Sequence, residues 1–105
     1  MTDKELLELA AKAAGIEPLG KAFEMNGDFA GFCLPARKIW NPLTDDGDAL
    51  RLAVKLRIEI YIHEDDTQCI GPNLHRAIET HKDDPYATTR RAIVRAAAEI
   101  GRGME

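Results

Sequence analysis

The segment Arg57–His63 is the sequence feature that most constrains the fold. Isoleucine stands at positions 58, 60 and 62, and polar or charged side chains stand between them. Because side chains alternate between the two faces of a strand, this pattern predicts a β-strand with one apolar and one polar face. Its apolar face must be covered by another layer, so we expect a sheet closed over by helices.

Two helices are predicted before this strand or next to it. The first runs from Asp3 to Ala14, with a Thr2–Glu5 capping box at its start and Gly15 as its stop. The second begins after Thr44 or Asp45, and its apolar face comprises Ala49, Leu50, Leu52, Ala53 and Leu56. Val54 points away from that face, which indicates more than one neighbour or a second subunit.

A third helix is predicted near the C-terminus. Asp84 is its N-cap, Pro85 its first residue, and it continues to Ile100 with Gly101 as its stop. Its apolar side comprises Tyr86, Ile93, Ala97 and Ile100. The tail Arg102–Glu105 is predicted to fray.

The remaining strands are predicted from turn residues. Residues 22–25 and 29–34 flank Asn26-Gly27-Asp28, a β-hairpin signal, after a break at Glu17–Gly20. Leu74–His81 is predicted as a strand, although the same residues suit a short helix, and 64–67 and 71–73 are predicted as turns. Pro35–Pro42 is a connector whose Trp40 packs in the core. The prediction is an α+β fold, order αββαββα, with a mostly antiparallel sheet of about four strands and three helices.

Composition sets the class of protein. The 105 residues and 11.6 kDa suit a single domain, 1–105, and the net charge of −4 provides no general attraction to nucleic acid or anionic lipid. No apolar stretch is long enough to span a membrane, and Met1–Leu7 does not resemble a signal peptide, so we expect a cytoplasmic protein. Cys33 and Cys69 are expected to be free thiols.

Sequence motifs for catalysis or cofactors are not found. The sequence has neither a Walker A motif nor a dinucleotide fingerprint, its cysteines and histidines lack zinc spacing, and it contains no serine. We therefore expect no cofactor and assign no catalytic residue.

Two constellations remain as candidate sites. If the strands 57–63 and 74–81 share a polar face, a metal-binding or acid–base surface would form from Glu59, Tyr61, His63, His75, Glu79 and His81. Arg91, Arg95 and Arg102 form a row on the last helix that suits a phosphate backbone or an acidic protein. Each set is also what an ordinary solvent-facing surface looks like.

Three segments together resemble a known family: KELLELAAKAAGI (4–16), WNPLTDDGDALRLAVKL (40–56) and ATTRRAIVRAAAEIG (87–101). They are similar to the phage ABA-sandwich domain of small phage and prophage proteins, and more distantly to the phage NinX proteins. The resemblance implies a layered α/β/α domain in a bacterial host cell, with no established activity. Residues 36–39 and 64–81 depart from the family pattern.

Three functions follow as hypotheses. The first is a non-enzymatic phage accessory protein that binds a host or phage macromolecule through a surface. The second is a metal-dependent or acid–base enzyme using the His/Glu face, and the third is a weak nucleic-acid binder using the arginine row. Apolar residues on more than one helix face are also compatible with a homodimer.

Overall fold

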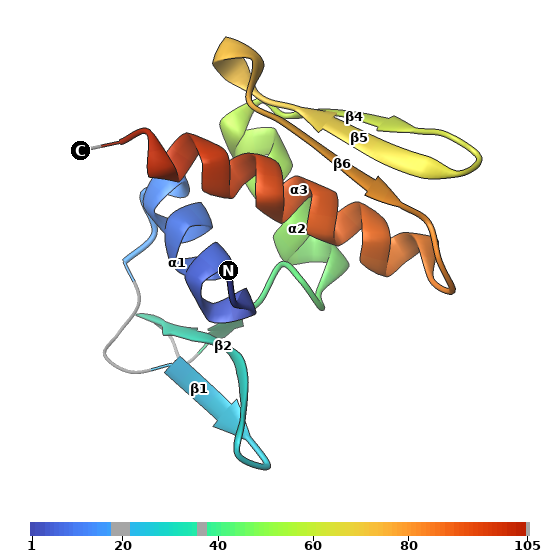
Figure 1. The fold of residues 1–105 in the computed structure, drawn as a ribbon. Helices are drawn as coiled ribbons and strands as arrows, with labels where there is room; N and C mark the ends of the chain where they lie inside the picture. The colour runs from blue at the N-terminus through green and yellow to red at the C-terminus, as the bar shows by residue number, and fades with distance from the viewer. Residues whose placement is uncertain (18–21, 36–37, 105) are drawn as a thin grey trace.

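A computed structural model describes residues 1–17, 22–35 and 38–104. In that part of the chain, three α-helices, one short 3-10 helix and six strands follow one another (Figure 1). In chain order they are α1 (Asp3–Ala14), β1 (Ala22–Met25), β2 (Asp28–Leu34), β3 (Lys38–Trp40), α2 (Asp46–Leu56), β4 (Glu59–Ile62), β5 (Asp66–Ile70), η2 (Pro72–Leu74), β6 (Arg76–Thr80) and α3 (Pro85–Arg102).

The predicted start and end of α1 and the predicted start of α2 are confirmed. The Thr2 hydroxyl accepts from the Glu5 amide at 3.2 Å, and the Glu5 carboxylate accepts from the Thr2 amide at 3.1 Å. The Glu5 carboxylate accepts from both the Thr2 amide and the Thr2 hydroxyl, and these bonds hold the pKa of Glu5 below its usual value. Gly15 ends α1 in the left-handed conformation, with φ of 71°. Asp45 caps α2, because its carboxylate accepts from the Asp48 amide at 2.8 Å.

The third helix begins as predicted, at Asp84 and Pro85, but the predicted stop at Gly101 is wrong. α3 continues to Arg102, and Gly101 is a buried residue within it. A Cβ added to Gly101 would lie 2.0 Å from the backbone oxygen of Leu9 in α1. Gly101 therefore allows two helix backbones to approach closely. In the sequence, a glycine needed for such a contact looks the same as a glycine that ends a helix.

The α+β class and the antiparallel pairing are confirmed, whereas the single sheet of about four strands is wrong. The first sheet has the order β1-β2-β3 and the second the order β4-β5-β6, and all pairs are antiparallel. β3 occupies three residues of the predicted connector. β5 was not predicted, and its first two residues, Asp66 and Thr67, lie in the segment 64–67 that was predicted as a turn.

α3 is the centre of the molecule. It packs against α1 and α2 on one side and against β5 and β6 on the other, and the β1–β2 hairpin lies at the far end (Figure 1). Small side chains make this possible: seven residues of α3 are buried, and five of them are alanine or glycine. Tyr86, predicted on the apolar side of this helix, is instead 71% exposed, because it lies in the first turn, before the helix enters the core.

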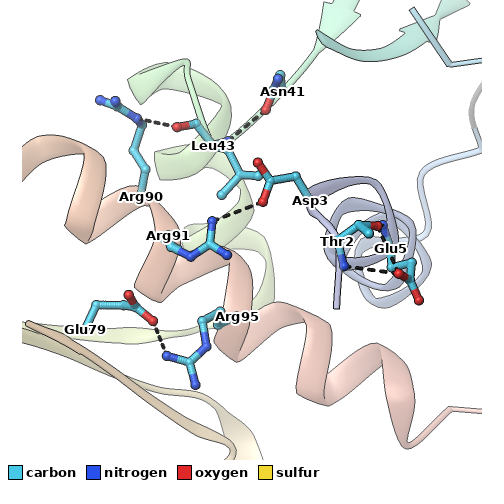
Figure 2. Close-up of polar contacts among 9 residues, drawn as sticks. All are labelled: Thr2, Asp3, Glu5, Asn41, Leu43, Glu79, Arg90, Arg91 and Arg95. Carbon is cyan, nitrogen blue, oxygen red and sulfur yellow. Dashed lines mark hydrogen bonds and ion pairs between the residues drawn. The ribbon is translucent and has the colours of Figure 1, made fainter. Parts of the chain in front are cut away.

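The segment WNPLTDD joins β3 to α2 through a set of buried polar contacts. Trp40 is in the core, as predicted. The Asn41 side chain accepts from the Leu43 amide at 3.0 Å, and the Asn41 amide donates to the buried carboxylate of Asp48, also at 3.0 Å. From α3, the Arg90 side chain donates to the Leu43 oxygen at 2.9 Å (Figure 2). This distinctive stretch thus has a structural role.

Some predicted features fall at the limits of the described chain. The break at Glu17–Gly20 lies outside it from residue 18 onward, as do residues 36 and 37 of the connector and Glu105 of the tail. In the described part, none of the helices has both the length and the apolar character needed to cross a membrane.

Candidate functional site

The predicted His/Glu face is wrong, because the strand register separates its members. β5 lies between β4 and β6, and it pairs Tyr61 with Gln68 and Gln68 with Ile78. Directly opposite residues share a face, so the β6 residue on the Tyr61 face is Ile78. Glu79 pairs with Thr67 and lies on the other face, toward α3.

His63 and His81 lie beside the turn between β4 and β5, at one end of the second sheet, and His75 lies at its other end. His63 follows β4 and its Nδ1 is 2.8 Å from the Asp66 carboxylate. His75 follows η2, and His81 follows β6. Among the described residues, no group of three or more His, Cys, Asp or Glu side chains is placed to hold a metal ion.

The one histidine close to a hydroxyl is His81, whose Nε2 lies 2.7 Å from the Thr67 hydroxyl. That hydroxyl is also 2.8 Å from the Thr89 hydroxyl. Thr67 is fully buried, so the pair links the second sheet to α3 and presents no nucleophile to a substrate. Cys69 beside it is equally enclosed, and burial raises the pKa of its thiol to about 11.

On the open face of the second sheet, Tyr61 and Glu59 form a local pair. The Tyr61 hydroxyl donates to the Glu59 carboxylate, and that hydrogen bond raises the pKa of the phenol. A phenol held protonated is a hydrogen-bond donor at neutral pH rather than a base. This pair offers a binding contact.

In the arginine row, Arg91 and Arg95 pair with carboxylates of other elements (Figure 2), whereas Arg102 pairs with a carboxylate of its own helix. Arg91 pairs with Asp3 of α1 at 3.1 Å, Arg95 with Glu79 of β6, and Arg102 with Glu99 at 3.5 Å. Arg90, in the same helix, pairs with Asp46 of α2 at 2.6 Å. The pairs of Arg90, Arg91 and Arg95 connect α3 to its neighbours, and every one of these pairs reduces the positive charge available to bind a phosphate backbone.

Arg95 also covers one edge of the second sheet. The His81 amide donates to the Asp65 oxygen and the Gly71 amide to the His75 oxygen. Because bonding alternates along an antiparallel pair, the backbone of Ile78 must face outward, away from β5. Arg95 donates to the outward Ile78 oxygen at 3.2 Å. Arg95 therefore covers one outward backbone oxygen in the middle of the β6 edge.

The opposite edge, at β4, has no such cover. The His63 amide donates to the Asp66 oxygen at 2.8 Å, so the alternation turns the N–H and C=O groups of Ile60 and Ile62 away from β5. In the described part of the chain, no side chain hydrogen-bonds to these groups. β4 also lacks the lysine, proline or bulge with which exposed edges are commonly blocked.

An apolar groove of about 530 Å³ runs beside this edge, and we call it the β4 groove. It forms because α3 supports β5 and β6 while β4 overhangs the helix layer, leaving a hollow between β4, α2 and the start of α3. Its lining includes Ala49, Leu50, Ile60, Ile62, Tyr86 and Ile93. The Arg90–Asp46 pair lies within the same lining.

Large apolar side chains around the groove are strongly exposed. Leu50 is 59% exposed, Ile62 65% and Tyr86 71%, and Val54 follows Leu50 by one helical turn. Fully burying a side chain of this size contributes roughly 1.5–3 kcal/mol. The groove therefore combines unused apolar surface with unused backbone hydrogen-bonding groups.

A larger hollow of about 920 Å³ lies between α1 and the β1–β2 hairpin, with Lys4, Glu8, Lys12 and Glu24 in its lining. Its charges are mixed in sign. It contains no comparable set of exposed apolar side chains.

The sequence identified Ile60 and Ile62 as apolar strand residues but could not identify them as edge residues. That requires knowing that β4 pairs on one side only, with β5, and β5 was itself not predicted. The usable signal was Val54, whose outward position indicated a second neighbour.

Comparison of the chain with protein-family models, with curated proteins and with solved structures found no match.

Proposed function

We propose that this chain is a non-enzymatic protein-binding module. Its binding site is the β4 groove together with the open edge of β4, and it takes an extended segment of a polypeptide by strand addition. The observation that carries this proposal is the outward-facing backbone of Ile60 and Ile62 beside the exposed Leu50, Ile62 and Tyr86. The backbone provides hydrogen bonds, and the groove provides apolar contact.

The resemblance to the phage ABA-sandwich domain supports a biological setting for this module. It favours an accessory protein of a phage or prophage, with layered helices and sheets, acting in the cytoplasm of a bacterial host on a host or phage protein. Catalysis is not favoured, because the Thr67–His81 pair is buried and the three histidines do not all lie at one end of the sheet. Nucleic acid is not favoured either, because the arginine row is paired.

The proposal is tested with a synthetic strand as the probe. A nine-residue peptide of alternating isoleucine and lysine suits an apolar groove on a chain of net charge −4. Titrated into labelled protein at the lowest concentration that NMR allows, it should shift the amide signals of Ile60 and Ile62 and slow their exchange with solvent. The Ile78 amide on the opposite edge is the internal control and should not change.

The matched variants are Ile62→Pro and Ile78→Pro. Each removes one outward N–H from an edge strand without removing a bond to β5, a substitution that edge strands tolerate. Ile62→Pro should weaken peptide binding by at least about tenfold, as expected for loss of a hydrogen bond and an apolar contact. Ile78→Pro should leave binding unchanged. Equal binding by both variants, or amide shifts confined to β6, would contradict the proposal.

A further inference from the structure

The β4 edge is self-complementary, which identifies the chain that it binds. Two β4 strands related by a two-fold axis run antiparallel, and their outward groups must meet outward groups. Ile60 of one copy then pairs with Ile62 of the other, and the reverse, with Tyr61 opposite Tyr61 on the axis. All four outward N–H and C=O groups of each copy are satisfied in this register.

The charges favour this register over the two alternatives in which one β4 strand is shifted by two residues along the other. With Tyr61 on the axis, Glu59 lies opposite His63 of the second copy, the residue that follows β4 and still pairs with β5. His63 Nδ1 is 2.8 Å from the Asp66 carboxylate, and in the protonated ring the Nε2–H is the donor left for Glu59. Shifting the centre to Ile62 instead moves Glu59 beyond the end of the second β4 strand, toward the acidic turn that contains Glu64 and Asp65. Centring on Ile60 leaves Glu59 opposite Tyr61.

The apolar surface agrees with the same arrangement. In a continuous sheet, Ile60 and Ile62 of both copies lie on the helix-facing side, where they form one row. The β4 groove of each copy then opens toward the second copy, and the exposed stripe of Leu50 and Val54 on α2 borders the same junction. The strongly exposed apolar residues around the groove are thus on the side where a second copy arrives.

We infer that the polypeptide taken at the β4 edge is a second copy of this chain, giving a two-fold dimer with a continuous six-stranded sheet in the order β6-β5-β4-β4-β5-β6. This inference rests on the proposed function and names its partner. Tyr61 lies at the two-fold axis, and the two grooves are covered against each other.

The first test is the mass of the full chain in solution, measured by sedimentation equilibrium over a range of concentrations. The wild type should approach twice 11.6 kDa. Ile62→Pro should raise the dissociation constant by at least about tenfold, because each copy loses an intermolecular donor. Ile78→Pro should behave as the wild type. Circular dichroism checks that both variants remain folded.

The second test fixes the register by cross-linking. Opposed residues in a non-hydrogen-bonded pair have Cα atoms about 4.5 Å apart, within the range of a disulfide. In a Cys33→Ala background, Tyr61→Cys should form a covalent dimer on mild oxidation. Ile78→Cys is the matched control, because Ile78 is on the same face, is 48% exposed against 43% for Tyr61, and lies on the opposite edge. It should remain monomeric on denaturing gels.

The outcomes separate this inference from the proposed function. A wild type that stays monomeric while the isoleucine–lysine peptide still protects Ile60 and Ile62 overturns the dimer and leaves strand addition standing, with a foreign chain as the occupant. If the wild type is monomeric and does not bind the peptide, both the dimer and the proposed function are overturned. A dimer broken by Ile78→Pro, or cross-linked only through Ile78→Cys, places the contact on β6 and also overturns the inference.

Discussion

At the scale of single residues, Gly101 shows how strongly one position is constrained. It lies in the last turn of α3, where the helix crosses α1, and an added Cβ would come 2.0 Å from the Leu9 oxygen. Neither backbone can move without disturbing the contact between these two helices, which is the most extensive between any two elements of the described fold. Glycine is necessary at position 101 because there is no room for a Cβ, and not because the backbone needs extra flexibility.

We therefore expect Gly101→Ala to lower the free energy of unfolding by about 3 kcal/mol, the scale of a severe overpacking. Urea denaturation followed by circular dichroism measures the loss. Gly103→Ala is the matched control, since its Cβ would lie 3.7 Å from the nearest backbone oxygen and its φ of −80° suits alanine. Gly103→Ala should unfold at or slightly above the wild-type midpoint. Equal midpoints for the two variants would contradict this role of Gly101.

At the scale of elements, Asp48 joins β3 to α2. Its side chain is almost fully buried and accepts from the Asn41 amide at 3.0 Å and from Arg51 at 2.8 Å, with Lys38 at 3.6 Å. A buried carboxylate is tolerated only with such partners. The acidic start of α2 therefore does more than complement the helix dipole.

Removing this carboxylate should cost about 2–3 kcal/mol of stability, because Asp48→Ala leaves the buried Asn41 amide without an acceptor. The measurement is again the urea midpoint, with the exposed Asp83→Ala as the control. Arg51→Ala should cost less than about 1 kcal/mol, since the Arg51 side chain is largely solvated. If Arg51→Ala proved as costly as Asp48→Ala, the ion pair rather than the backbone bond would dominate.

At the scale of the whole molecule, the two sheets differ in how firmly they are attached. The second sheet packs along α3 through β5 and β6, and its Thr67, Cys69 and Ala77 are buried. The first sheet contacts the helices mainly through Phe32 and Trp40, while β1 is half-exposed or exposed along its length. The core is thus centred on α3, with the β1–β2 hairpin at its margin.

This arrangement predicts two levels of local stability. Amides of β5 and central α3, such as those of Cys69 and Val94, should exchange only through global unfolding. Amides of β1 that pair with β2 should exchange through local opening, at a free energy at least about 2 kcal/mol lower. Native-state hydrogen exchange at increasing low denaturant, read by NMR, makes the comparison. Uniform protection across both regions would show that the sheets open as one unit.

Sequence-based prediction was accurate for features that depend on interactions between residues close in the sequence, and it failed for features that depend on distant residues. Helix ends were predictable because Thr2, Asp45 and Asp84 bond to amides within three residues of themselves. The candidate His/Glu face failed because it required the register of β6 relative to β4, and an unpredicted strand lies between them. A shift of one residue in the pairing of two strands moves every side chain of the shifted strand to the other face of the sheet.

The sequence alone therefore determined the three helices, their N-terminal caps, the alternating strand β4 and the hairpin at Asn26-Gly27, all of which depend on short-range hydrogen bonding and side-chain periodicity. Only the tertiary structure decided that the strands form two sheets, that Gly101 is a helix contact, that Arg95 covers the β6 edge, and that β4 is left open beside a groove. These features depend on which distant segments lie side by side. The hydrophobic periodicity of one segment does not indicate which other segment packs against it.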